Sequence, residues 1–175
     1  MAVDDDPRWP LPVDHPSALP EAIGRVAMSS AMLECTLRNV IDSLRFKYFE
    51  ERLTRGKPLK DLIEIADQAF KNRSIWDRQS VYEEWRLLRS ELRRINNERN
   101  HVLHSIWIVD QGGKMTARRE NNKATKRAQP FTLDRVRKLS MAITNVTVDV
   151  GTLQWNATAA ESGNSETPRR TGDAH

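Results

Sequence analysis

The sequence has little cysteine and no long apolar run, and both absences narrow the class of protein. Its 175 residues hold one cysteine, Cys35, so the chain cannot form an internal disulfide. No stretch approaches the ~20 apolar residues that a membrane-spanning helix needs. Residues 1–16 lack the basic and apolar regions of a signal peptide. We therefore expect a cytoplasmic protein with no membrane partner.

The common cofactor and metal motifs are missing as well. Neither the G-x-x-x-x-G-K-[ST] loop nor the G-x-G-x-x-G loop occurs, so the usual nucleotide-phosphate sites are absent. His101 and His104 are three residues apart, but no third ligand follows at a familiar spacing. Cys35 falls within an apolar helical pattern, which favours a small core residue over a nucleophile. We expect neither a metal nor a cofactor.

Four segments show the apolar spacing of amphipathic helices, with turn residues such as Gly56 and Pro58 between them. The expected helices cover residues 17–55, 59–71, 75–105 and a segment that starts at 132. Between the third and the fourth, two short runs flank Asp110-Gln111-Gly112-Gly113, which predicts a hairpin. The expected fold is therefore all-α, a four-helix bundle with a short β-hairpin inserted between helices three and four.

The two ends of the chain differ from this body. Residues 1–16 are rich in proline and are expected to form an extended arm, so the helical domain covers residues 17–155. Residues 156–175 are polar without apolar periodicity, and we expect a disordered tail. The tryptophans are expected to anchor the core and the hairpin rather than to stack on bases. These are Trp76, Trp85, Trp107 and Trp155.

The net charge of +4 permits a polyanionic partner without requiring one. Much of the excess lies in one segment between the hairpin and the fourth helix. Its basic residues are Arg118, Arg119, Lys123, Lys126 and Arg127. Two interpretations stay open, a solvated connection and a loop that contacts nucleic-acid phosphates.

The third helix carries a charge inside its apolar stripe. At about 100° per residue, Arg99 lies between Leu92 and Ile95 in angle. The same projection places Glu34 on the apolar face of the first helix. Because an uncompensated buried charge is costly, we predict that Glu34 and Arg99 pair across the bundle. The pair either fixes helix register or orients Arg99 toward a ligand.

A second, polar stripe runs along the opposite side of the third helix. Arg93, Asn97, Asn100 and His104 follow at intervals of four, three and four, so they share one face. The simple interpretation is a solvated face that ends in a favourable C-terminal cation. Asparagine is a poor helix former, however, and Asn96, Asn97 and Asn100 occur within five positions. This clustering favours a functional role.

The segment Glu98-Arg99-Asn100-His101-Val102-Leu103-His104 resembles the R-x4-6-H signature of the HEPN superfamily (higher eukaryotes and prokaryotes nucleotide-binding). The polar residue directly after the arginine is the family's common form. The long preceding helix and the bundle context are similar to HEPN proteins as well. The resemblance covers about residues 17–150 and implies a HEPN-like four-helix bundle.

In that family the catalytic members are metal-independent endoribonucleases, often toxins or defence effectors, that dimerise to form a composite site. The resemblance therefore implies that His104 acts on the ribose 2′-OH or the leaving oxygen. Arg99 would stabilise charge on the scissile phosphate, and Asn100 would position the phosphate or the histidine. Supporting roles fall to Glu34, Asn97 and Arg93. The implied partners are RNA, a second copy of the chain and a cognate antitoxin.

A non-catalytic function stays open beside this one. Arg99 and His104 differ by about 140° around a helix, so a continuous helix cannot point both at one phosphate, whereas two copies can. In the alternative, the chain is a helical interaction module in which Arg99–Glu34 is a core pair. Asn100 and His104 would then only cap the end of the third helix.

Overall fold

The computed structural model describes residues 18–44, 54–74, 79–109, 115–118 and 129–159. In chain order these residues form four helices and three short strands. They are α1 (Ala18–Leu44), α2 (Leu59–Ser74), α3 (Gln79–Leu103), β1 (Ile106–Val109), β2 (Met115–Arg118), β3 (Gln129–Pro130) and α4 (Leu133–Ala159). The fold is predominantly helical, which confirms the all-α expectation. The described part holds no helix long and apolar enough to span a membrane.

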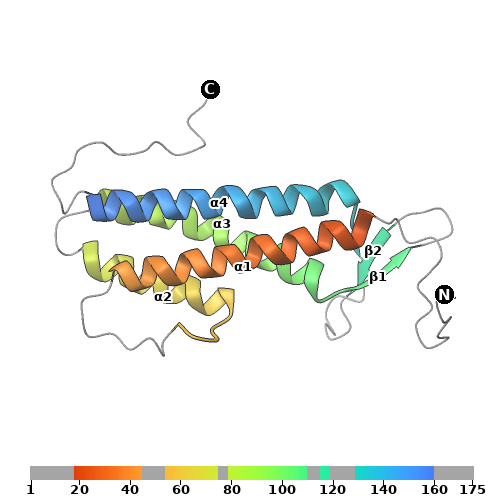
Figure 1. Cartoon of the computed structure of the whole chain (residues 1–175), viewed down its shortest axis with the longest axis horizontal. Coiled ribbons are helices and arrows are strands. Elements are labelled where there is room, and N and C mark those ends of the chain that lie inside the picture. The colour runs from red at the N-terminus through yellow and green to blue at the C-terminus, as the bar shows by residue number, and fades with distance from the viewer. Residues whose placement is uncertain (1–17, 45–53, 75–78, 110–114, 119–128, 160–175) are drawn as a thin grey trace, which may run out of the picture.

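The helices lie side by side, with α1 packed along α4 and α2 along α3 (Figure 1). The small sheet lies at one end of the bundle, where α3 ends and α4 begins (Figure 1). Its strands follow the order β1-β2-β3, and both pairings are antiparallel. The expected hairpin is therefore present, and β3 adds a short strand that the sequence did not predict.

The core is built from the apolar stripes of all four helices. Trp85 of α3 is fully buried and stacks on Phe70 of α2, with 4.6 Å between the ring centroids. Trp107 of β1 is half-buried, and its Nε1 donates to the Val102 carbonyl at 3.1 Å. Its ring also meets Phe131 edge-on. Both tryptophans anchor the fold as expected: Trp85 joins α3 to α2, and Trp107 holds the sheet against the end of α3.

Two residues expected in the core lie outside it. Cys35 is exposed, and Trp155 keeps 57% of its surface accessible. Each lies two positions after a buried leucine, Leu33 or Leu153, and two residues turn a helix by about 200°. Both side chains therefore point away from the core, so these two predictions were wrong. Trp76 lies outside the described residues.

Two helices continue past their expected ends. α2 runs through Asn72 to Ser74, where a break was expected. α4 runs to Ala159, so the tail boundary set at residue 156 was too early. Its threonines are accommodated within the helix, and the hydroxyls of Thr144 and Thr147 donate to carbonyls four residues back. The expected arm, the continuation of α1 past residue 44 and the tail from residue 160 lie outside the described residues.

Candidate functional site

The predicted pair between the first and third helices is present. Glu34 Oε1 lies 3.2 Å from Arg99 Nη2, and the two side chains are only 18% and 19% exposed. Glu34 comes from the middle of α1, and Arg99 comes from the last two turns of α3. The prediction of this contact from helical angles alone is confirmed. The guanidinium is therefore held in place from across the bundle.

A second arginine shares the same carboxylate. Arg38 Nη2 lies 3.3 Å from Glu34 Oε2, and the Arg38 guanidinium also donates to the carbonyls of Thr54 and Lys57. These contacts tie the turn before α2 to α1. Sequence reasoning missed Arg38, although its spacing of four residues from Glu34 on one helix could have revealed it. Glu34 thus compensates two guanidinium groups.

Asn100 extends the network along α3. Arg99 Nη1 donates to Asn100 Oδ1 at 3.0 Å, and Asn100 Nδ2 donates to Asn96 Oδ1 at 3.4 Å. Asn96 is buried, and this hydrogen bond satisfies its side-chain oxygen. A guanidinium has five N–H donors, and the contacts that Arg99 makes with Glu34 and Asn100 occupy one on each terminal nitrogen. Donors therefore remain on both terminal nitrogens for a ligand oxygen.

His104 is the first residue beyond α3, and its side chain is exposed. Its backbone N–H donates to the Asn100 carbonyl at 3.2 Å, so it follows directly on the last helical turn. Among the described residues, no hydrogen bond joins its imidazole to Arg99 or Asn100. The structure thus brings Glu34, Arg99 and Asn100 into contact and leaves His104 open to solvent at the same end of α3.

The other two supporting residues lie farther from this cluster. Arg93 is exposed and pairs with Glu64 of α2 at 2.7 Å, which links α3 to its neighbour. Asn97 is exposed, as the solvated-face interpretation expects. The polar stripe therefore divides into a surface part and a half-buried part, and only Asn100 joins the Arg99 network.

His101 belongs to the packing of the sheet on the bundle. The His101 ring stacks on the Phe131 ring, with 5.1 Å between the ring centroids. The Arg135 guanidinium lies 4.3 Å from the centroid of the Phe131 ring. In the described part of the chain, no group of three or more His, Cys, Asp or Glu side chains is arranged to hold a metal ion.

The basic segment starts beside the motif. The backbone of Arg118 pairs with Ile106, two residues after His104, so the chain leaves the sheet close to the end of α3. The side chains of Arg118, Arg119, Lys123, Lys126 and Arg127 lie outside the described residues. Their role as phosphate contacts stays a prediction.

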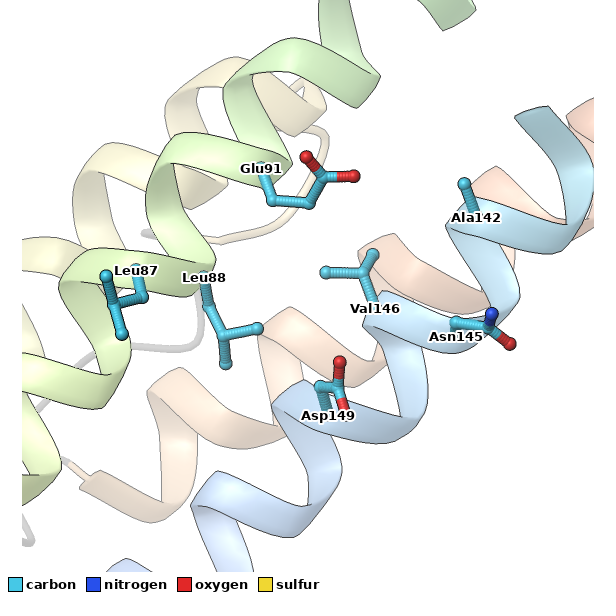
Figure 2. Close-up of a pocket in the computed structure, with 7 residues that line it drawn as sticks. All are labelled: Leu87, Leu88, Glu91, Ala142, Asn145, Val146 and Asp149. Carbon is cyan, nitrogen blue, oxygen red and sulfur yellow. The ribbon is translucent and has the colours of Figure 1, made fainter. Parts of the chain in front are cut away.

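A separate groove of about 330 Å³ lies between α3 and α4. Figure 2 shows Leu88 and Val146 projecting into it, with the Glu91 and Asp149 carboxylates at its edge. A hydrogen bond from Arg94 lowers the pKa of Glu91 against a smaller opposing effect of burial, so this carboxyl stays ionised near neutral pH. Two carboxylates over an apolar floor repel a polyanion, and the groove is unsuited to nucleic-acid phosphate.

No family model matches the chain, and no curated protein and no solved structure matches it.

Proposed function

We propose that this chain is a HEPN-like, metal-independent endoribonuclease that binds RNA at the C-terminal end of α3. The observation that carries the proposal is the ordered cluster at this end. Arg99 is fixed by Glu34 and Asn100, and the exposed His104 follows within five residues. A fixed guanidinium and an accessible imidazole are the two groups that cleavage by a neighbouring 2′-OH requires.

The chemistry follows from these two groups. The His104 imidazole accepts the proton of the ribose 2′-OH, and the 2′ oxygen attacks the adjacent phosphorus. The 5′ oxygen then leaves with a proton from the medium or from an imidazolium. The products are a 2′,3′-cyclic phosphate and a 5′-OH. Arg99 stabilises the extra negative charge on the pentacoordinate phosphorus, and Asn100 and Glu34 position its guanidinium.

The end of α3 eases the angular problem noted in the sequence. Side chains five residues apart diverge by about 140° only within a continuous helix. His104 keeps one helical hydrogen bond, from its N–H to the Asn100 carbonyl, and Asn100 lies one turn earlier on the same face with its side chain in contact with Arg99. A phosphate bound at Asn100 would then lie between both groups of one chain, and we propose that the basic segment that begins at Arg118 adds cationic contacts.

The contacts of Arg99 also favour a second candidate, a non-catalytic interaction module. Glu34 and Asn100 together hold the guanidinium in a network that would stabilise the bundle without any ligand. In that case His104 takes part in no reaction, and its replacement leaves the RNA as intact as with wild type. The two candidates therefore differ in one experiment.

The test is incubation of purified protein with mixed RNA in EDTA, with wild type beside His104→Ala. Loss of general acid–base catalysis is expected to lower the cleavage rate by about 100-fold or more. The control is Arg86→Ala, which removes an exposed charge near the other end of α3. Cyclic phosphate ends from wild type and Arg86→Ala, but not from His104→Ala, support the enzyme. Intact RNA with all three folded proteins supports the module.

A further inference from the structure

α4 carries a second apolar stripe besides the one that faces the core. Its buried stripe includes Ile143 and Val150. On another side, Met141 is 66% exposed, Val148 is 48% exposed and Trp155 is 57% exposed. Residues seven apart return to nearly the same face of a helix, so these three form one line, the α4 outer stripe. A line of exposed apolar residues on a helix is a candidate contact surface.

The surface around the α4 outer stripe holds few charges, and on α1 the exposed Glu21 and Arg25 form an ion pair. Ser29 of α1 lies within hydrogen-bond distance of Ser140 and Thr144 of α4, so α1 flanks the stripe. Two exposed residues of α1 extend this region, Met28 at 71% and Met32 at 64% exposed. Between Leu139 and Ala159 the only charged residue is Asp149, which lines the groove toward α3.

An apolar surface of this kind is unusual in a chain with 30% charged residues. Monomeric soluble proteins rarely expose large contiguous apolar patches, and such patches commonly mark interaction sites.

We propose that the α4 outer stripe is a homodimer interface in which α4 packs antiparallel on α4 of a second copy, with the two-fold axis at Val148. Met141 and Trp155 are each seven residues from Val148. The axis therefore places Val148 against Val148, and Met141 of each copy against Trp155 of the other. A two-fold interface must be self-complementary, and a thioether packs favourably against an indole ring.

Charge and size favour a second copy as the occupant. Arg137 and Lys138 precede the stripe at one end only, so an antiparallel pair keeps the basic groups of the two copies at opposite ends. A parallel pair would bring these like charges together. With the axis at Val148, two antiparallel copies of α4 overlap over residues 137–159, about 33 Å, and a surface of two helices is about 20 Å wide. The overlap is of the order of 700 Å² per partner, close to the ~800 Å² of a stable interface.

This dimer differs from the composite dimer that the family resemblance implies. α4 begins at the end of the bundle where α3 ends (Figure 1). An axis at Val148 in the middle of α4 therefore places the two His104 residues near opposite ends of the dimer. The proposed interface is independent of RNA cleavage, because it uses only the exposed faces of α4 and α1, away from the end of α3.

Single cysteines in the full chain test the register. In a Cys35→Ser background, Val148→Cys is expected to give covalent dimers with a short bis-maleimide. Met141→Cys alone and Trp155→Cys alone are expected to stay monomeric on a denaturing gel, because equal positions are then about 20 Å apart. An equal mixture of these two variants is expected to cross-link. Efficient self-cross-linking of Met141→Cys, or failure of both Val148→Cys and the mixture, overturns the proposal.

Sedimentation equilibrium tests the dimer without cross-linking. Val148→Lys places two charges at the axis and is expected to raise the dissociation constant at least tenfold. Leu87→Lys is the matched control, because Leu87 is 68% exposed and lies in the groove between α3 and α4. A wild type that stays monomeric at 100 µM, or equal weakening by both variants, contradicts the interface. RNA cleavage is expected to be unchanged in Val148→Lys, so a failed dimer and a failed nuclease are distinguishable.

Discussion

Glu34 and Arg99 are 65 positions apart in the sequence and form an ion pair between α1 and α3. Both side chains are less than one-fifth exposed, so the pair is largely withdrawn from water. The same carboxylate also faces Arg38. Removal of Glu34 therefore leaves two guanidinium groups without their shared counter-charge, whereas removal of Arg99 leaves Arg38 to compensate Glu34. The two deletions are not equivalent.

The first prediction concerns this asymmetry. Glu34→Gln is expected to lower the free energy of unfolding by about 1–3 kcal/mol, and Arg99→Met by less. The double variant is expected to be less destabilised than the sum of the two, with a coupling energy of about 1 kcal/mol. Urea unfolding of all four proteins measures the cycle. Strictly additive losses would mean that the two side chains do not interact in solution.

The sequence predicted this contact because both charged residues fall within apolar stripes. The helical period alone fixes the angle at which each side chain leaves its helix. The same reasoning, had it been applied to Cys35, would have placed it outside, since it lies two residues after buried Leu33. The error came from reading the composition of the surrounding run instead of the angle. The angle around a helix thus predicts its inner face, whereas the composition of a run does not.

The rest of the site depends on contacts that no period encodes. Arg38 reaches carbonyls of Thr54 and Lys57, which requires the path of the chain between α1 and α2. β3 contains only Gln129 and Pro130, too short for an alternation pattern. The direction of the His104 side chain follows from where α3 ends, and helix ends are the part of a helix that sequence patterns define least well.

The second prediction tests the start of α4. Thr132 Oγ1 accepts a hydrogen bond from the Arg135 backbone N–H at 3.1 Å, as a helix N-cap does. Thr132→Ala is expected to cost about 1 kcal/mol of stability, while Thr132→Ser keeps the acceptor and most of the stability. Thermal and urea unfolding report the difference. Equal losses in both variants would show that the methyl group matters and the hydroxyl does not.

The third prediction concerns the buried indole of α3. Trp85 Nε1 donates to Asp67 Oδ1 at 3.0 Å, and the Asp67 carboxylate also pairs with Arg89. Trp85→Phe keeps an aromatic ring beside Phe70 but removes the donor. We expect a loss of about 1–3 kcal/mol, because a hydrogen bond to a charged group is lost and a gap remains. Urea unfolding measures the loss, and Trp107→Phe is the comparison, since its indole donates to a neutral carbonyl. A smaller loss for Trp85→Phe than for Trp107→Phe contradicts the argument.

The last prediction concerns pH. Arg94 contacts both carboxylate oxygens of Glu91, at 2.5 and 2.8 Å, and this hydrogen bonding lowers the pKa of Glu91 from its ordinary 4.5. The folded protein therefore prefers the ionised carboxyl. The resulting stability is fully present above pH 4.5 and disappears as the pH falls through the lower folded value.

The stability difference between wild type and Glu91→Gln is thus expected to be constant near neutral pH and to shrink in acid. Both groups are more than 40% exposed, so salt is expected to reduce the difference as well. Arg94→Gln removes this interaction together with the contact to Glu98 at 3.0 Å, so its loss is expected to be larger and also to shrink in acid. A stability difference that grows as the pH falls would show that the ionised Glu91 carboxylate does not stabilise the fold.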